Sequence, residues 1–290
     1  MKIIGIVVLY HPPSDLIDNI LSYIAYLDKL IVWRNSVCDE IILPEKYKEW
    51  EAKTIIMGSK TNNGIGEAYN TAVTYAVKHH YTHLLTMDQD SRFMNNDFQI
   101  YLERINHEKE MAIFSPNYII DGKNLYLEQT SLLEVETSAS SGSVYPIDIF
   151  NKIGLFRSEF FIFNIDVEFS LRAQQNGIPT KIVSSVYLFH LMGYKKKKHK
   201  FLWKTFIPNE YSPASTYYLV RNGIVAKRLY PYANHWKGYL FYWFYKRLFC
   251  VLCFEKDKYA KCKGLLLGYI HGKMGKTGKQ TIFDELPITI

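Results

Sequence analysis

Short apolar runs that end at polar residues recur along the first part of the chain. Four of them have the length and β-branched content of buried strands, at 3–10, 29–33, 53–57 and 82–87. Apolar residues at helical spacing predict helices over 15–27 and 67–78. Strands that alternate with helices indicate an α/β sheet, in which ligands bind beyond the carboxyl ends of the strands.

The pattern is less regular in the second half. Strands are predicted over 112–118, 134–138 and 181–189, and short helices over 148–153 and 166–175. A lysine-rich run at 195–200 then precedes an aromatic and basic tail that we expect to be helical. The sequence therefore predicts an α/β domain over 1–200 and a helical region over 201–290.

Composition limits the classes of partner. The chain has 290 residues, 48% of them hydrophobic, and its net charge of +7 favours anionic partners such as sugar nucleotides or an acidic membrane face. No nucleic-acid partner is expected, because the basic residues gather beside an apolar tail rather than along an interleaved face. The first apolar run is too short to span a bilayer and lacks a signal-peptide cleavage site, so we expect a cytoplasmic protein. The cysteines show neither a disulfide framework nor the spacing of a zinc site. They are Cys38, Cys250, Cys253 and Cys262.

Two carboxylates, Asp88 and Asp90, follow the fourth predicted strand. Alternate side chains of an extended chain point to the same side, so both carboxylates can face one cation. Mg²⁺ or Mn²⁺ typically combines one or two carboxylates with phosphate oxygens of a substrate. The pair indicates metal-assisted handling of a phosphorylated donor, and a solvated acidic turn is the alternative.

Other polar residues follow predicted strands or precede helices. His11 and Asn35 follow the first two strands, and the loop at 62–66 either offers main-chain N–H groups to an anion or caps the next helix. His190 follows the last strand and is a candidate metal ligand or phosphate donor, although single histidines are commonly structural. The small residues at 140–143 allow close approach of a hydroxylated ligand or form a turn.

Asp166 is the candidate catalytic base. It follows the apolar segment 160–165, and apolar surroundings raise the pKa of a carboxyl and make it a better base. Its place at a helix start lowers the pKa instead, because the positive end of the helix dipole stabilises the carboxylate. The alternative is an ordinary helix-start residue paired with Arg172.

Taken in order, these motifs resemble the family 2 inverting glycosyltransferases of the GT-A fold, in particular rhamnosyltransferase-like bacterial members. The resemblance spans roughly residues 1–222. Its motifs are the first strand, Asn-Gly-Ile-Gly-Glu-Ala-Tyr-Asn at 63–70, Met-Asp-Gln-Asp-Ser at 87–91, Ser-Gly-Ser at 141–143, Phe-Asn-Ile-Asp-Val-Glu-Phe-Ser-Leu-Arg at 163–172, His-Leu-Met-Gly at 190–193 and Tyr-Tyr-Leu-Val-Arg-Asn at 217–222.

The resemblance implies a mixed sheet flanked by helices that binds a nucleotide-diphosphate sugar, and inverting transfer of that sugar to an acceptor hydroxyl. Asp88 would lie near the ribose and the metal, Asp90 would be the principal metal carboxylate, and His190 would contact metal or diphosphate. Asp166 maps onto the general base, and Mg²⁺ or Mn²⁺ would offset charge on the leaving diphosphate. The other expected site residues are His11, Asn35, Asn63, Gly64, Arg221 and Asn222 for the donor, and Ser141, Gly142 and Glu168 for the acceptor or its sugar.

One position departs from the family pattern. The family usually has an Asp before Asn35 to contact the nucleotide, and this chain has Arg34. A guanidinium accepts no hydrogen bond, so base recognition differs here or Arg34 reaches a phosphate instead. The donor is expected to carry rhamnose on thymidine diphosphate or a hexose on uridine diphosphate.

The segment 239–254 is strongly aromatic, but Lys246 and Arg247 interrupt it. A charged pair is costly at a bilayer centre, whereas aromatic rings with flanking lysines suit the headgroup region. We therefore expect an interfacial helix at the inner face of the cell membrane, aided by about 4 kcal/mol from the lysines at 195–198. Such docking would fit a glycan or lipid-linked oligosaccharide acceptor in surface polysaccharide synthesis. A helix packed on the catalytic domain is the alternative.

Two other functions remain open from the sequence. A nucleotidyltransferase also uses paired aspartates on an α/β sheet, but it normally needs a glycine-rich basic phosphate loop where this chain has His11-Pro12-Pro13. A membrane-docked scaffold could bind glycan or sugar nucleotide without turnover. Such a scaffold would not need Asp88, Asp90, Asp166 and His190 together.

Overall fold

The computed structural model describes residues 1–37, 45–190 and 198–283, and the chain divides into two compact units. Unit 1 comprises Met1–Phe156 and Phe169–Leu191. Unit 2 comprises Arg157–Glu168 and Met192–Ile290, so it includes the segment that carries Asp166. The positions singled out in the sequence that lie outside the described residues are Cys38, the residues at 191–193 and the lysines at 195–197.

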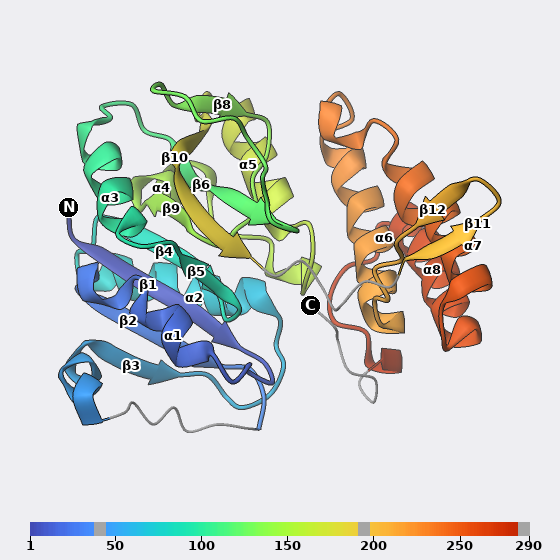
Figure 1. The fold of residues 1–290 in the computed structure, drawn as a ribbon, viewed down its shortest axis with the longest axis horizontal. Coiled ribbons are helices and arrows are strands. Elements are labelled where there is room, and N and C mark those ends of the chain that lie inside the picture. Colours follow the sequence, from blue (N-terminus) through green and yellow to red (C-terminus); the bar gives the residue numbers. More distant parts are fainter. Residues whose placement is uncertain (38–44, 191–197, 284–290) are drawn as a thin grey trace. The chain divides into compact units, whose positions relative to one another are not determined.

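A mixed β-sheet forms the centre of unit 1 (Figure 1). Its strands are β1 (Ile3–Leu9), β2 (Lys29–Arg34), β3 (Thr54–Met57), β4 (His83–Asp88), β5 (Ser91–Phe93), β6 (Ile113–Ile120), β7 (Lys123–Asn124), β8 (Leu133–Val135), β9 (Ser143–Pro146) and β10 (Thr180–His190). The main order is β3-β2-β1-β4-β9-β6-β10-β5, with β7 beside β6 and β8 beside β10. β3, β2, β1 and β4 are parallel neighbours, so their carboxyl ends meet at one edge of the sheet.

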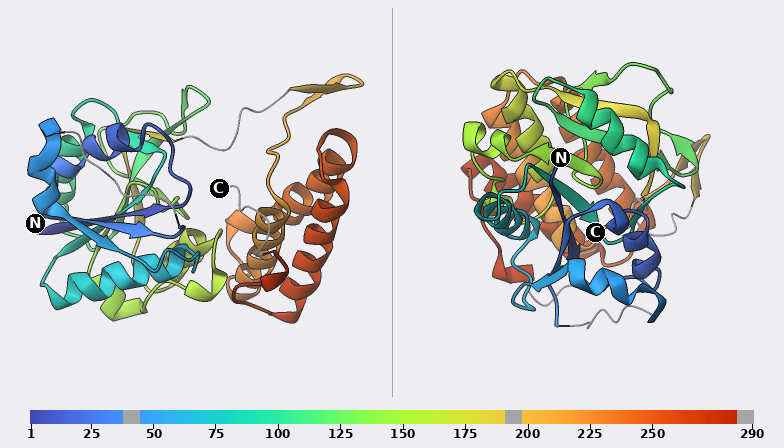
Figure 2. Two further views of the ribbon diagram at one scale, coloured as in Figure 1. Left: turned by 90° about the horizontal axis from the view of Figure 1, so that it is seen from below. Right: turned by 90° about the vertical axis from the view of Figure 1, so that its left-hand side faces the viewer.

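Helices cover both faces of this sheet. They are α1 (Leu16–Leu21), α2 (Ile65–Lys78), α3 (Asp97–His107), α4 (Asp148–Ile153) and α5 (Ile165–Gln175), of which unit 1 contains the part from Phe169 onward. Leu16 of α1 and Phe98 of α3 belong to one core cluster with Val7 and Met87 of the sheet. The left view of Figure 2 shows α2 on the other side of the sheet from α1. The expected α/β fold, a mixed sheet flanked by helices, is confirmed.

The first helix is shorter than its apolar pattern predicts. α1 ends at Leu21, and a 3-10 turn, η1 (Ile24–Tyr26), takes the place of the remaining turns. The Ser22 hydroxyl donates to the main-chain oxygen of Asn19 and accepts from the Phe93 N–H, at 2.7 and 3.0 Å. Such side-chain bonds to the main chain compete with helix continuation.

Unit 2 is mainly helical, as the sequence predicts. Its elements are η3 (Ser158–Phe160), a hairpin of β11 (His199–Phe201) and β12 (Lys204–Phe206), α6 (Pro213–Leu229), η4 (Asn234–Trp236), the π-helix η5 (Phe241–Lys246), α7 (Arg247–Phe254), α8 (Lys258–Met274) and η6 (Thr281–Phe283). α6 and α8 are in close contact because α8 presents glycines to α6. A Cβ at Gly264 would lie 2.6 Å from the main-chain oxygen of Pro213, and one at Gly268 would lie 2.7 Å from that of Tyr217. Only glycine permits this approach of two helix backbones.

Arg247 is one of the two charges that the sequence placed at a membrane interface, and this placement is wrong. The residue is 5% exposed and forms an ion pair with the buried Glu255. Lys261 completes the buried group, with its Nζ 2.9 Å from Glu255. A buried charge needs such partners, so Arg247 is part of the interior of unit 2.

The aromatic segment 239–254 has two sides. Phe244 and Leu248 pack against the cluster of α6 and α8 side chains around Val220. Phe241 and Tyr245 are 60% and 61% exposed. The segment therefore combines a packed face with an exposed aromatic face. No helix within the described ranges is both long and apolar enough to cross a membrane.

Candidate functional site

Polar side chains gather where the parallel strands of unit 1 end. His11 lies just beyond β1, Asn35 follows β2, and Asp88 is the last residue of β4. His190 ends β10, which runs parallel to β6. All four residues lie at or just beyond strand ends, which is where the sequence predicts them.

Asp88, Asp90 and His190 form the candidate metal site. One ligand atom of each lies within 4.8 Å of the others, and all three side chains are partly exposed. The Nδ1 atom of His190 is 3.7 Å from Oδ1 of Asp90. Two carboxylates and an imidazole at this separation suit a divalent cation that also takes oxygen ligands from a substrate. The residues therefore fit the metal site that the sequence implies.

The pairing of β5 with β10 explains how His190 reaches the aspartates. The two strands are antiparallel, and His190 lies opposite Ser91, the residue after Asp90. The Ser91 hydroxyl is 2.7 Å from Nδ1 of His190. A hydrogen bond of this kind fixes the ring orientation of a metal-binding histidine. Ser91 is thus a supporting residue whose role the sequence did not indicate.

Burial raises the pKa of the Asp90 carboxyl above its ordinary value. His190, a main-chain hydrogen bond and the Ser91 hydroxyl act in the opposite direction, and the negative charge of Asp15 adds to the rise. The carboxylate form is therefore costly when the site holds no positive charge, and a cation would stabilise it.

Ser141 and Gly142 support Asp88 from the neighbouring loop. Ser141 is fully buried, and its Oγ accepts a hydrogen bond of 3.1 Å from the main-chain N–H of Asp88. Gly142 has a φ of +77°, and a Cβ there would lie 2.8 Å from Cγ of Pro116. This geometry favours a role in positioning Asp88 over the contact with an acceptor sugar that the resemblance suggested.

The loop before α2 is closed by side-chain amides. Oδ1 of the buried Asn35 accepts from the main-chain N–H of Asn63 at 3.0 Å, and its Nδ2 donates to Oδ1 of Asn62 at 3.1 Å. The same Asn62 oxygen accepts from the N–H of Gly64 at 3.1 Å. The two N–H groups expected to bind an anion already have protein partners. These contacts favour the alternative, a loop that leads into the helix, over anion binding at Asn63 and Gly64.

Arg34 and His11 lie near this loop. The Nε atom of Arg34 is buried and has no hydrogen-bond partner among the described residues. The main chain of Gly58 packs on Arg34, since a Cβ at Gly58 would lie 2.4 Å from the Arg34 oxygen. His11 has a φ of +49° and is exposed. A buried donor without a partner costs free energy, which an acceptor on a ligand would reduce.

Asp166 lies in unit 2, at the start of α5. Its carboxylate is half-buried and accepts a hydrogen bond of 2.8 Å from the N–H of Val167. Three residues just before it have left-handed backbones: Phe161, Phe163 and Asn164, with φ of +67°, +63° and +59°. This conformation is unfavourable for residues other than glycine, and it persists only where the surroundings impose it.

Asn222 imposes this conformation. The residue is fully buried on α6, and its Nδ2 donates to the main-chain oxygens of Phe160, Ile162 and Phe163 at 2.8, 2.6 and 3.0 Å. The amide thus holds the segment before Asp166 at three points. Asn222 is a positioning residue in this structure, and the expected contact with donor phosphates is not supported.

Arg221, like Asn222, is a buried residue of α6 that bonds to main-chain oxygens. Its guanidinium is fully buried and donates to the main-chain oxygens of Phe160, at 3.1 Å, and of Gly278. Its Nε also donates to Oδ1 of Asn222 at 2.8 Å, which turns the amide nitrogen toward the loop. Burial lowers the pKa of Arg221, and the Tyr217 and Tyr218 rings next to it act in the opposite direction. The expected donor-phosphate role is likewise not supported, because the group is committed to the main chain.

Tyr239 provides a further support that the sequence did not indicate. Its hydroxyl accepts from Nδ2 of Asn164 at 3.0 Å and donates to the main-chain oxygen of Leu219 at 2.8 Å. The ring packs on Gly223, where a Cβ would lie 2.1 Å from it. Burial is the main cause of a raised pKa at Tyr239, and the charge of Asp166 contributes in the same direction. The Asp166 carboxylate is therefore close enough to raise the pKa of the Tyr239 phenol.

Glu168 is buried rather than open to an acceptor. It is 0% exposed, and its Oε1 accepts from the Tyr230 hydroxyl at 2.6 Å and from Nε of Arg157 at 3.0 Å. These contacts tie the start of α5 to the end of α6. The structure favours a positioning role over the expected contact with the acceptor.

One known protein resembles the chain in sequence over most of its length. The dTDP-rhamnosyl transferase RfbF of Shigella flexneri is 26% identical over 236 residues, which cover 75% of this chain and 77% of that protein. A search against protein-family models found no match.

Solved structures with the same fold share little sequence with the chain. S. aureus TarS has a TM-score of 0.60 at 13% identity, over 94% of this chain and 81% of that chain. TarS in complex with UDP-GlcNAc has a TM-score of 0.57 at 15% identity. GalNAc-T7 with UDP, GalNAc and Mn²⁺ has a TM-score of 0.52 at 14% identity, over 66% of this chain. The match covers 44% of the GalNAc-T7 chain, so this chain spans less than half of its length.

Proposed function

We infer that this chain, which belongs to the family 2 glycosyltransferases of the GT-A fold, transfers a sugar from a nucleotide donor to an acceptor hydroxyl with inversion. The observation that carries the inference is the grouping of Asp88, Asp90 and His190 at the strand ends of unit 1. A nucleotidyltransferase would place paired aspartates similarly, but it normally needs a glycine-rich basic phosphate loop where this chain has His11-Pro12-Pro13.

In the proposed reaction, Asp88, Asp90 and His190 hold a divalent ion. Mg²⁺ or Mn²⁺, when bound, would offset the negative charge that develops on the departing diphosphate. Asp166 accepts the proton of the acceptor hydroxyl while the hydroxyl oxygen bonds to the anomeric carbon. The bond from that carbon to the diphosphate oxygen breaks on the opposite face, so a single displacement inverts the configuration.

Two donors are the first candidates. Thymidine diphosphate-rhamnose is favoured because the similar protein from Shigella flexneri is a dTDP-rhamnosyl transferase. A hexose on uridine diphosphate is second, because TarS was solved with UDP-GlcNAc. Arg34, whose Nε has no partner among the described residues, would donate to a phosphate or base oxygen of either donor.

We also propose that unit 2 docks on the inner face of the membrane and meets a lipid-linked glycan there. Residues 201–290 contain 14 Lys and Arg but only five Asp and Glu, so they account for the positive charge of the chain. Trp203 is 84% exposed, in addition to the exposed aromatic face at Phe241 and Tyr245. Aromatic rings beside basic residues suit the headgroup region of an anionic leaflet.

The test is an assay of nucleoside diphosphate release from dTDP-rhamnose and UDP-hexoses, with detergent-solubilised bacterial membrane lipids as acceptor. We expect release from one donor in Mn²⁺, loss of release in EDTA, and an inverted anomeric carbon in the product by NMR. Release that is unaffected by EDTA would contradict the metal role. Metal-dependent donor binding without release, with or without lipids, would favour the sugar-nucleotide-binding scaffold.

A further inference from the structure

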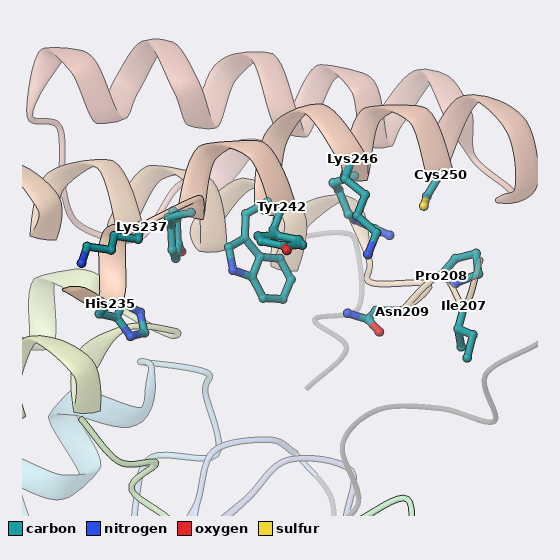
Figure 3. A pocket seen from close by; sticks show the side chains of 11 residues that line it. Ile207, Pro208, Asn209, His235, Lys237, Tyr242, Lys246 and Cys250 are labelled. Carbon is teal, nitrogen blue, oxygen red and sulfur yellow. The ribbon is translucent and has the colours of Figure 1, made fainter. Parts of the chain in front are cut away.

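Two adjacent pockets open on the surface of unit 2. The first, which we call the polar pocket, has a volume of about 280 Å³ and lies between the helix that carries Tyr242 and the segment at 207–209 (Figure 3). The name refers to Asn209, His235 and Lys237, which line this pocket together with aromatic and aliphatic side chains such as Trp243 and Ile207. The second, which we call the apolar pocket, has a volume of about 770 Å³ and is lined largely by aromatic side chains. These are Phe206, Phe241, Tyr242, Tyr245 and Phe249.

The two pockets share a wall. Ile207, Tyr242 and Lys246 line both of them, and the last two belong to η5. η5 is a π-helix, a rare conformation that occurs frequently at functional sites. Its wide turn sends Trp243 to the polar pocket and Tyr245 to the apolar pocket. A single short helix therefore lines both pockets.

The polar pocket adjoins the segment that carries the proposed base. Tyr239 lines this pocket, and its hydroxyl bonds to Asn164, two residues before Asp166. All three residues belong to unit 2. The Tyr239 hydroxyl therefore connects the lining of the polar pocket to the segment that carries Asp166.

The shared wall also carries a charge without a counter-charge. Lys246 and Lys237 are exposed, and neither has a carboxylate within ion-pair distance among the residues that the structure describes. Nζ of Lys246 lies 5.3 Å from the ring centroid of Tyr242. Arg247, the next residue, is neutralised by Glu255 and therefore does not add to the charge at the pocket. An ammonium group at the border of an apolar pocket suits a phosphate that is joined to an apolar chain.

We propose that the two pockets form the acceptor site and bind a saccharide linked through a phosphate to a lipid chain. The saccharide stacks in the polar pocket beside Trp243 and Tyr239, the phosphate pairs with Lys246, and the chain lies against Tyr245 and Phe241. Aromatic walls with a few polar groups are typical of ligand pockets. The proposal rests on the proposed function and assigns the acceptor of that reaction to particular residues.

The probe for this site is dodecyl phosphate, kept below its micelle concentration and titrated by calorimetry into the full chain. We expect saturable one-to-one binding, and at least tenfold weaker binding of inorganic phosphate and of dodecanol. Lys246→Ala should weaken the binding of dodecyl phosphate by about tenfold, the typical effect of losing a hydrogen bond to a charged group. Lys263→Ala is the matched control, because Lys263 is exposed on α8 and lines neither pocket.

Three results would overturn the proposal. Equal weakening by Lys246→Ala and Lys263→Ala would attribute the affinity to the overall charge of unit 2. Inorganic phosphate that binds as tightly as dodecyl phosphate would remove the lipid chain from the site. Dodecanol that binds as tightly as dodecyl phosphate would remove the phosphate from the site.

A separate titration keeps this proposal distinct from the proposed function. Lys246→Ala should bind sugar nucleotides in Mn²⁺ as the unaltered protein does, because the metal site lies in unit 1. Intact donor binding without saturable dodecyl phosphate binding would overturn the acceptor site alone. Absence of donor binding in both proteins would overturn the proposed function.

Discussion

The side-chain nitrogen of Asn222 lies 2.6 Å from the main-chain oxygen of Ile162. The same nitrogen also contacts the oxygens of Phe160 and Phe163, although an amide has only two hydrogens to donate. At least one hydrogen is therefore shared between two carbonyls. Left-handed residues such as those in this segment each cost about 1–3 kcal/mol, so these hydrogen bonds offset real strain next to Asp166.

We predict that Asn222→Ala lowers turnover by about 10- to 100-fold while donor affinity changes little. Without the amide, the segment at 160–164 relaxes and Asp166 loses its fixed place, whereas the metal site lies in unit 1. The measurement is a comparison of kcat with the dissociation constant for the donor in Mn²⁺. A parallel loss of donor affinity would contradict the positioning role.

Tyr239→Phe tests the same support with a smaller change. It removes only the hydroxyl that accepts from Asn164, so the free energy of unfolding should fall by about 1–3 kcal/mol. Turnover should fall with donor affinity retained. Tyr187→Phe is the control, because its hydroxyl bonds to Glu128 in unit 1 instead. If the control lowered turnover more than Tyr239→Phe, the segment before Asp166 would not be the controlling element.

Asp166→Asn should remove the proposed base and keep the fold. An amide cannot take the acceptor proton, so sugar transfer should fall by about 10²- to 10⁴-fold. Donor binding in Mn²⁺ should remain within twofold of the unaltered protein. The check is a transfer assay together with a donor titration on the same preparation. Unchanged transfer would exclude Asp166 as the base.

Gly142→Ala should destabilise unit 1 and weaken metal binding. The new Cβ would lie 2.8 Å from Pro116 in a residue with φ of +77°, and Ser141 next to it holds Asp88. We expect a loss of about 1–3 kcal/mol in the free energy of unfolding, by urea titration. Gly122→Ala is the matched control, with φ of +75° and no atom within 4 Å of its Cβ. Equal losses in the two variants would show that the backbone angle alone is responsible.

The stability of unit 1 should depend on His83 at mildly acidic pH. Burial lowers the pKa of His83 from 6.5 to about 4, so the folded protein keeps the ring neutral where the unfolded chain binds a proton. Stability is therefore fully present above pH 6.5 and falls as the pH drops toward 4, by about 3 kcal/mol at most. Urea unfolding across this range should show a smaller fall for His83→Gln. Identical pH dependence of the two proteins would contradict the burial effect.

The sequence predicts the metal site in part because Asp88 and Asp90 are local to one strand end. His190 joins them only through β5, a strand of three residues that carries no apolar run. Its partner Ser91 therefore gave no signal, although it directly follows Asp90. Long apolar runs such as β1, β4 and β10 were predictable because burial on both faces of a parallel sheet requires them.

The residues around Asp166 were harder to assign. Arg221 and Asn222 are polar residues in a motif, which suggested phosphate contact, but their partners are main-chain oxygens far away in the sequence.

Arg247 and Lys246 are neighbours with opposite environments, one buried beside Glu255 and one exposed. Lys246 is the last residue of a π-helix and Arg247 follows it, so the 3.6-residue period of an α-helix does not predict which side chains of this segment share a face.

A calorimetric titration of dTDP-rhamnose and UDP-hexoses into the protein and into Asp90→Ala tests the metal-dependent donor site most directly. One donor should bind the unaltered protein in Mn²⁺ and lose at least tenfold in affinity in EDTA, because Asp88, Asp90 and His190 would hold an ion that offsets the charge of the donor diphosphate. Asp90→Ala should bind that donor in Mn²⁺ only as weakly as the unaltered protein does in EDTA, while Asp18→Ala, an exposed carboxylate of α1, should have no effect. Donor affinity that is the same in Mn²⁺ and EDTA, and unchanged by Asp90→Ala, would contradict the metal-dependent donor site.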